Sequence, residues 1–219
     1  MNLNEGHLIR LGSDLCSGVY GELLFLIHFG SSSEGSDADY LAVFDSRPLS
    51  PCVLLGNLDL WATDKEELKR YISLLDPVVT EPLLTGQFVE GKRDSYEEAR
   101  QWVYEVMPNT EVVSHLLRRS FVAFMRASEY CRVVEQDNNR LQRREFWSSL
   151  SYSMSYWCFA RHYLTAGQGV LSLQELVCMM HEEIRELWDI VQGMKKEGVA
   201  VDANALHRWA RTMISSHEM

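Results

Sequence analysis

The hydrophobic periodicity of the chain changes near residue 95, and this change restricts the possible folds more than any other feature. Before that point, apolar runs have the length of strands and are separated by Gly, Pro, Ser and Asp. After it, apolar residues recur at the three- and four-residue spacing of helices that bury one face. We therefore expect an α+β fold, with a small α/β domain over residues 1–92 and a helical domain over residues 93–219.

The first part of the chain predicts a small α/β unit with three strands and one well-defined helix. Three strands are expected, over residues 23–29, over residues 39–44 and within residues 53–61, the third centred on Leu58-Asp59-Leu60. Thr63 is followed three residues later by Glu66, which is the spacing of a capping box for a helix over residues 64–75. Pro77 is expected to end that helix, and residues 86–91, with a glycine at each end, indicate a loop.

The second part predicts a bundle of helices. They are expected over residues 96–107, 111–134, 144–165, 172–194 and 203–215. Ser172 and Glu175 form a second capping-box pattern. The stretch from Phe146 to Phe159 is rich in aromatic residues, which we expect to form core packing rather than a platform that stacks bases.

The charge distribution separates the two parts and excludes some functions. The net charge is −10, which argues against a broad electrostatic grip on nucleic acid or an anionic membrane. Residues 1–91 carry 5 basic and 14 acidic residues, whereas residues 92–171 carry 11 and 9. This Arg-bearing middle leaves open a function as an RNA-binding protein, which would bind RNA with strong salt dependence and without nucleotide.

The compartment is expected to be the cytoplasm. No apolar run is long enough to cross a membrane, and the N-terminus lacks the pattern of a secretory signal. The five cysteines are scattered, which is typical of reduced thiols. Cys178 and His181, three apart on one expected helix, offer only two metal ligands, and a packed helix face is the preferred interpretation.

Five glycine, serine and aspartate positions on or next to the three expected strands suggest a chemical site. The first strand ends in Gly30-Ser31, where the backbone can approach a polyphosphate closely and a hydroxyl can donate to it. Asp37 and Asp39 lie two apart at the start of the next extended segment, so both carboxylates point to one face. Such a pair suits Mg²⁺ or Mn²⁺. Asp59 lies between leucines on the following strand and needs a partner, which a shared metal ion would supply.

These residues resemble the signature of the DNA polymerase β-type nucleotidyltransferases, in particular the nucleotidyltransferases inferred in bacteria and phages. That signature is a hydrophobic strand, Gly-Ser, a loop, Asp-x-Asp on the next strand and a third acid on a later strand. The resemblance covers residues 23–90. This range includes Asp76-Pro77 and residues 81–84, which read Glu-Pro-Leu-Leu and also match the family. It implies a nucleotidyltransferase-like mixed-sheet unit followed by a C-terminal helical bundle. The five-residue loop from Ser32 to Ser36 is shorter than in most members.

The resemblance also implies an activity. The protein would transfer a nucleoside monophosphate from ATP or another nucleoside triphosphate to a hydroxyl acceptor, which is RNA, a protein or a small molecule. Asp37, Asp39 and Asp59 would be the catalytic residues and would hold Mg²⁺ or Mn²⁺. Gly30, Ser31 and Ser36 would bind the nucleotide. The alternative is a catalytically inactive binding or regulatory protein with the same fold. Such a protein could be encoded by a phage. The sequence leaves the oligomeric state open.

Basic and imidazole side chains outside this constellation have two interpretations. The set comprises His28, His115, Arg118, Arg119, Arg126, Arg140, Arg143 and Arg144. The arginines on the expected helix over residues 111–134 have guanidinium groups suited to phosphates, but a solvated helix face is the preferred interpretation for them and for His115. His28 is expected to be a packing residue of the first strand.

Overall fold

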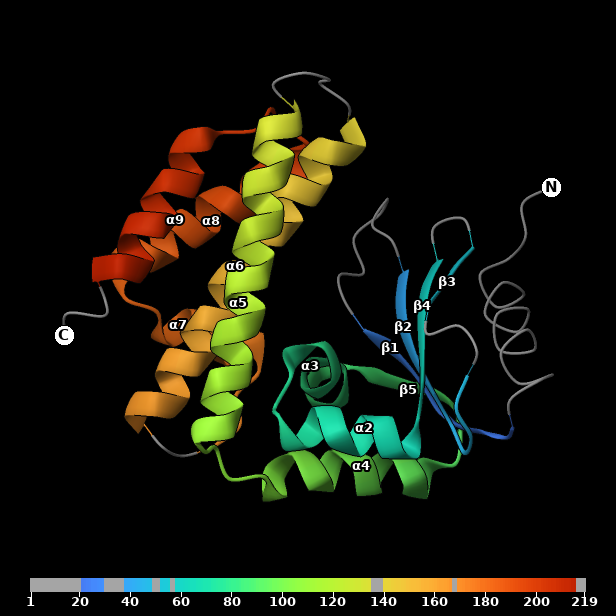
Figure 1. Ribbon diagram of the computed structural model, residues 1–219. Coiled ribbons are helices and arrows are strands. Elements are labelled where there is room, and N and C mark those ends of the chain that lie inside the picture. The colour runs from blue at the N-terminus through green and yellow to red at the C-terminus, as the bar shows by residue number, and fades with distance from the viewer. Residues whose placement is uncertain are drawn as a thin grey trace. The chain divides into compact units, whose positions relative to one another are not determined.

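A computed structural model describes residues 21–29, 38–48, 52–55, 58–134, 140–166 and 169–215 (Figure 1). The contacts divide the chain into two compact units, unit 1 over residues 1–107 and unit 2 over residues 108–219. Unit 1 contains a sheet and three described helices, and the described part of unit 2 is helical. The α+β class with C-terminal helices is therefore confirmed.

The sheet of unit 1 has five strands. They are β1 (Leu23–Phe29), β2 (Ala38–Phe44), β3 (Cys52–Leu55), β4 (Leu58–Asp64) and β5 (Gln87–Gly91). Their order in the sheet is β3-β4-β2-β1-β5. The β2–β4 pair is parallel, and the pairs β1–β2, β1–β5 and β3–β4 are antiparallel. The sheet is therefore mixed. The hairpin of β3 and β4 has β3 at the edge of the sheet and β4 next to β2.

The third strand, expected within residues 53–61 and centred on residues 58–60, is confirmed as β4, but the prediction of a loop over residues 86–91 was wrong. The first segment forms two antiparallel strands, β3 and β4, on either side of Gly56-Asn57. Residues of this type support a tight hairpin turn between strands. The second segment contains β5, which pairs with β1 at the edge of the sheet.

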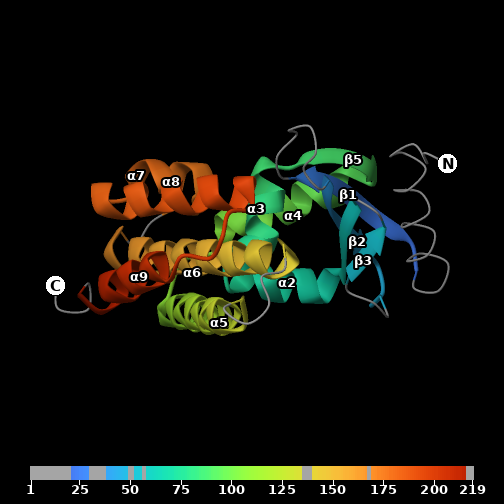
Figure 2. The same ribbon diagram turned by 90° about the horizontal axis from the view of Figure 1, so that it is seen from above.

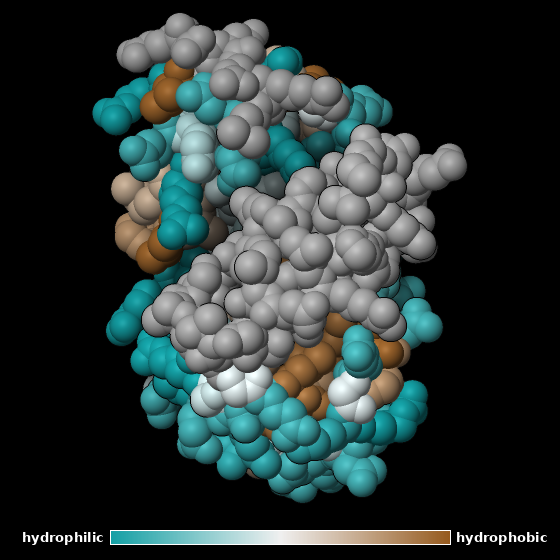
Figure 3. All heavy atoms as spheres, turned by 90° about the vertical axis from the view of Figure 1, so that its right-hand side faces the viewer, coloured by the Kyte–Doolittle hydropathy of each residue, from teal (hydrophilic) through white to brown (hydrophobic). Residues whose placement is uncertain are grey.

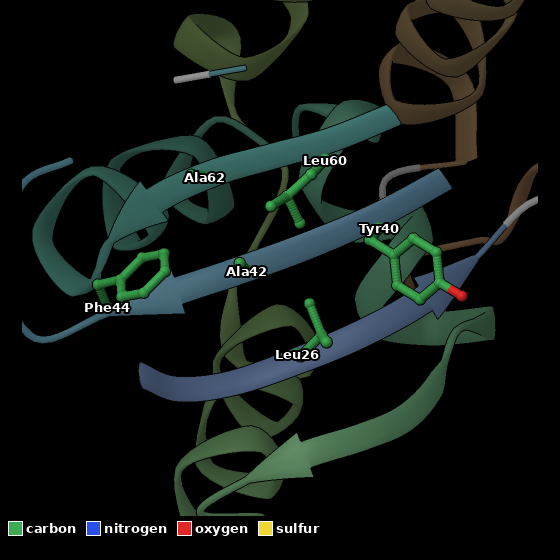
Figure 4. Close-up of a cluster of buried hydrophobic side chains, with 6 residues drawn as sticks. All are labelled: Leu26, Tyr40, Ala42, Phe44, Leu60 and Ala62. Atoms are coloured by element: carbon green, nitrogen blue, oxygen red, sulfur yellow. The ribbon is translucent and has the colours of Figure 1, made fainter. Parts of the chain in front are cut away.

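Both faces of the sheet are apolar. One face carries a buried cluster, shown in Figure 4, of Leu26, Tyr40, Ala42, Phe44, Leu60 and Ala62. Figure 4 also shows helices behind the strands, on the side away from this cluster. Seen from the right of Figure 1, a brown patch of hydrophobic side chains lies below the atoms drawn in grey (Figure 3). Because β1 is buried on both faces, its sequence is almost continuously apolar instead of alternating.

The other face of the sheet packs against the helices α2 (Lys65–Ser73), α3 (Pro77–Thr85) and α4 (Arg93–Glu105). The ring of Phe25 on β1 lies 5.8 Å from that of Tyr96 on α4, and the ring of Trp61 on β4 lies 5.4 Å from that of Tyr71 on α2. α4 was expected in the helical domain that begins at residue 93. It lies in unit 1, because the Tyr96 side chain is part of the core under the sheet.

The start of α2 differs from the predicted capping box. Asp64 is the N-cap, and its carboxylate accepts a hydrogen bond of 2.8 Å from the backbone N–H of Glu67. Thr63 is instead a fully buried residue of strand β4, one position before the cap. Pro77 does not simply end α2, since it is the first residue of α3, where its missing N–H costs nothing.

Unit 2 consists of α5 (Thr110–Val134), α6 (Arg140–Ala166), α7 (Leu173–Met179), α8 (Glu182–Glu197) and α9 (Ala203–Ser215). Figure 2 shows α6 between α5 on one side and α7 and α8 on the other. This central position explains why α6 is so rich in aromatic residues. Six of them are buried: Phe146, Trp147, Tyr156, Trp157, Phe159 and Tyr163. The expectation of a packed aromatic core is confirmed, although Tyr152 is exposed.

The helix expected over residues 172–194 is two helices, which corrects the sequence prediction. α7 ends at Met179, and α8 begins after His181, its N-cap. The Arg185 side chain donates hydrogen bonds of 3.2 Å to the carbonyls of Cys178 and Met180, and so satisfies the end of α7. Cys178 and His181 therefore do not share one helix face. The capping box of Ser172 and Glu175 is confirmed.

None of the described helices has the combination of length and hydropathy needed to cross a membrane.

Candidate active site

Two acidic residues lie side by side at one end of the sheet. β2 and β4 run parallel, and Asp39 of β2 is in register with Asp59 of β4. Neighbouring strands are about 4.8 Å apart, and residues in register on parallel strands point to the same face. The structure therefore brings two of the three predicted carboxylates together, although 19 positions separate them in the sequence.

The pair lies where the buried part of the face begins. Following β2 from Asp39, the same face continues with Leu41 and Val43, both 0% exposed. Following β4 from Asp59, it continues with Trp61 and then Thr63, which is 0% exposed. Asp39 and Asp59 are themselves half-buried. Their carboxylates thus stand at the rim of the core, with hydrophobic packing on one side.

Neighbouring elements fix this end of the sheet. Phe29, the last residue of β1, pairs with Asp39 across the strands. Trp61, next to Asp59 on the same face, is half-buried and its ring makes an edge contact with the ring of Tyr71 on α2. The indole is the neighbour that the sequence analysis missed. The signal was present in the period of two, because residues 59 and 61 of one strand share a face.

The structure does not describe the remaining predicted site residues, which are Gly30, Ser31, Ser36 and Asp37. They belong to the segment that joins Phe29 of β1 to Ala38 of β2, and these two strand ends flank the position of Asp39. Their roles remain predictions.

The donor set of the described pair fits a hard divalent cation. Two carboxylates on one face offer the oxygen ligands that Mg²⁺ and Mn²⁺ prefer. Within the described residues, no group of three or more His, Cys, Asp or Glu side chains is arranged to hold a metal ion. A site of the predicted kind therefore needs further oxygen ligands beyond Asp39 and Asp59, from Asp37, from water or from a phosphate.

His28 does not belong to this pair. It is in register with Tyr40 on β2, and the two rings lie 5.0 Å apart. Tyr40 belongs to the buried cluster on the opposite face of the sheet from Asp39. The expectation of a packing role for His28 agrees with this contact.

The basic residues of α5 and α6 lie in unit 2. Arg119 is half-buried, donates a hydrogen bond of 2.9 Å to the hydroxyl of Tyr156 and lies over its ring. Arg118 and Arg126 are exposed, as expected for a solvated helix face. α6 begins at Arg140, which places Arg143 and Arg144 in its first turns.

Comparisons with known proteins add little to this geometry. A scan against models of protein families finds no match, and a search among curated proteins finds none. Among solved structures, the chain is similar to a nucleotidyltransferase-like protein from Exiguobacterium sibiricum 255-15. The sequence identity is 12%, the TM-score is 0.36, and the likeness covers 90% of this chain and 70% of that chain. A likeness at this level carries no argument about function, so the function has to be argued from Asp39, Asp59 and their surroundings.

Proposed function

We propose that the protein is a metal-dependent nucleotidyltransferase, which moves a nucleoside monophosphate from a nucleoside triphosphate to a hydroxyl acceptor. The observation that carries the proposal is the register of Asp39 with Asp59 on adjacent parallel strands. The two half-buried aspartates lie in register on strands about 4.8 Å apart, so a cation bound between them would offset the repulsion of two like charges.

The reaction has a simple balance. The acceptor oxygen forms a bond to the α-phosphorus, the bond from that phosphorus to the pyrophosphate oxygen breaks, and one proton is released. A divalent ion held by Asp39 and Asp59 would neutralise phosphate charge and favour the ionised form of the acceptor hydroxyl. In this proposal the Asp59 carboxylate also takes up the acceptor proton. Asp37 completes the carboxylate set, and Gly30, Ser31 and Ser36 contact the phosphates.

The rim position suits this chemistry. The buried residues Leu41, Val43 and Thr63 on the same face exclude water from one side of the pair. Carboxylates that are partly screened from water interact more strongly with a cation than fully solvated ones. Asp39 and Asp59 both keep part of their surface exposed, as a residue that meets a ligand must.

The test is calorimetric binding of ATP, GTP, CTP and UTP in the presence of Mn²⁺. Asp39→Asn and Asp59→Asn keep the size of the side chain and remove its charge. Each change should weaken Mn²⁺-dependent nucleotide binding by at least about 100-fold, since even residues that only support metal ligands contribute about 10–100-fold. The matched control is Asp94→Asn, an exposed carboxylate in the first turn of α4. This control should bind like the wild type.

Two results would count against the proposal in different ways. No binding of any triphosphate by the folded wild type would contradict a nucleotide site altogether. Metal-dependent binding that never releases pyrophosphate, with RNA and protein hydroxyls supplied as acceptors, would contradict transfer and favour the inactive binding protein. Pyrophosphate release that is lost in Asp39→Asn and Asp59→Asn alike would support the transferase.

A further inference from the structure

One face of the sheet in unit 1 is buried, although no described helix of that unit lies over it. The side chains on this face are at most 4% exposed, and they are Leu26, Tyr40, Ala42, Phe44, Leu60 and Ala62. The helices α2, α3 and α4 lie on the opposite side, behind the strands in Figure 4. Apolar side chains are removed from water only where another surface packs on them. A further part of the chain must therefore cover this face.

The start of β1 fixes where residues 1–20 join the sheet. The backbone N–H of Glu22 donates a hydrogen bond of 2.9 Å to the carboxylate of Asp45, and the N–H of Asp45 donates one of 3.0 Å to the carbonyl of Glu22. Gly21 has a φ of 109°, and a Cβ at this position would collide with the Asp45 carboxylate. The backbone thus makes a turn that favours glycine. Leu23, two residues later, packs against the buried cluster and is in register with Phe44, so residues 1–20 join the sheet at one end of this face.

Residues 1–20 carry the sequence pattern of a helix with one apolar stripe. The stripe recurs at three- and four-residue spacing, at Leu8, Leu11, Leu15 and Val19. Polar residues fall on the opposite side, at Arg10, Ser13, Asp14 and Ser17. The other segments of unit 1 that the structure does not describe are polar or very short, namely residues 30–37, 49–51 and 56–57. Within unit 1, residues 1–20 are therefore the segment suited to cover an apolar face.

The dimensions of the face fit one helix. The cluster lies on β1, β2 and β4, three neighbouring strands about 4.8 Å apart, so it is about 10 Å wide. A helix with its side chains is about 10–12 Å across, and residues 8–19 would form about 18 Å of helix. β2 has seven residues and is therefore about 23 Å long. A single helix of this length covers the face without extending beyond it.

We propose that residues 8–19 form an amphipathic helix whose apolar stripe packs on this face of the sheet. Ala42 and Ala62 lie in register at the centre of the face, where their small side chains leave room for larger ones from the covering helix. Leu11 and Leu15, in the middle of the stripe, fill that space. The proposal is independent of the transferase activity, because Asp39 and Asp59 lie on the other face of the sheet.

The experiment measures the labelling of an introduced cysteine in the full chain. Ala42→Cys places a thiol at the centre of the face, and a maleimide followed by mass spectrometry gives its labelling rate. This thiol should be protected in the otherwise unchanged chain. Leu11→Asp/Leu15→Asp should raise the rate by about tenfold or more, because charges in an apolar contact favour the uncovered state. Ser13→Asp/Ser17→Asp adds the same charges on the polar side and should leave the rate unchanged.

A second cysteine position distinguishes uncovering of the face from unfolding of unit 1. Ala99 is 0% exposed on α4, which packs against the other face of the sheet. The thiol of Ala99→Cys should therefore stay protected in every background. If Leu11→Asp/Leu15→Asp exposes it as well, the milder Leu15→Ser replaces that pair, with faster labelling of Ala42→Cys and unchanged protection of Ala99→Cys as the expected result.

Contrary results are equally specific. Rapid labelling of Ala42→Cys in the otherwise unchanged chain would overturn the proposal, as would a rate that the leucine variants do not raise. Equal acceleration by Ser13→Asp/Ser17→Asp would show that the apolar stripe does not make the contact. Protection that is lost on dilution would assign the cover to a second copy of the chain, and this result too would overturn the proposal.

Discussion

The indole nitrogen of Trp209 on α9 donates a hydrogen bond of 2.9 Å to Oγ of Ser153 on α6. Both side chains are 0% exposed. The hydroxyl of Ser120 on α5 lies 3.3 Å from the same oxygen and donates to the Ser153 carbonyl at 2.8 Å. One serine of the central helix thus links three helices of unit 2.

Ser153→Ala should therefore destabilise unit 2. The change leaves the Trp209 N–H without its acceptor in a buried position, which costs about 1–3 kcal/mol. The free energy of unfolding in urea, followed by tryptophan fluorescence, measures the loss. Ser128→Ala on α5 is the matched control, because the Ser128 hydroxyl bonds only a carbonyl of its own helix, that of Phe124. Equal losses in the two variants would contradict a special role for Ser153.

Asp76 is the buried N-cap of α3, and its removal should weaken unit 1. Its side chain is 0% exposed and accepts a hydrogen bond of 3.1 Å from the N–H of Val78. Asp76→Ala should lower the free energy of unfolding by about 1–2 kcal/mol, the usual contribution of an N-cap. Asp76→Asn retains an acceptor oxygen and should cost less. Chemical denaturation of the two variants distinguishes them, and a larger loss in Asp76→Asn would contradict the capping role.

The capping box of α7 should respond to acid. Hydrogen bonds from the backbone N–H and the hydroxyl of Ser172 lower the pKa of Glu175. A lowered pKa in the folded state means that the ionised carboxylate stabilises α7 above the ordinary glutamate pKa. That contribution is lost as the pH falls through the lowered pKa. The amide resonance of Ser172 should titrate in this acidic range and stay constant in Glu175→Gln, whose side chain does not ionise.

The described cysteines should differ sharply in reactivity. Burial raises the pKa of the Cys158 thiol to about 12, so almost none of it is thiolate near neutral pH. Cys178 is exposed. A thiol reagent at pH 8, followed by mass-spectrometric mapping, should label Cys178 in the folded protein and Cys158 only after unfolding. Labelling of Cys158 at the rate of Cys178 would show that α6 is not packed as described.

The sequence predicted local features well where they depend on neighbouring residues. Ser172 and Glu175 were identified by spacing alone, since a capping box is a contact between residues three apart. The same rule failed at Thr63, because Asp64 one position later supplies a better acceptor and the strand continues through Thr63. Which of two adjacent residues becomes the N-cap depends on where the strand before the helix ends. The local sequence does not show where that is.

Long-range pairing explains the other differences. The three acids were expected to share a site, but the sequence alone did not show that β4 lies parallel to β2. That arrangement depends on β3 forming a hairpin with β4, whereas the sequence predicted only one strand within residues 53–61. β5 escaped prediction because it is short and mostly exposed, and only its pairing with β1 makes it a strand.

The register of β2 with β4 makes the carboxylate pair sensitive to the number of residues as well as to their identity. Side chains alternate between the faces of a strand, so a one-residue insertion within β4 ahead of Asp59 would move that side chain to the face of Leu60. An insertion in the segment between Pro48 and Cys52 would leave the alternation intact. Insertions should therefore be tolerated before β3. At the start of β4 an insertion should disrupt the carboxylate pair, even if no amino acid is substituted.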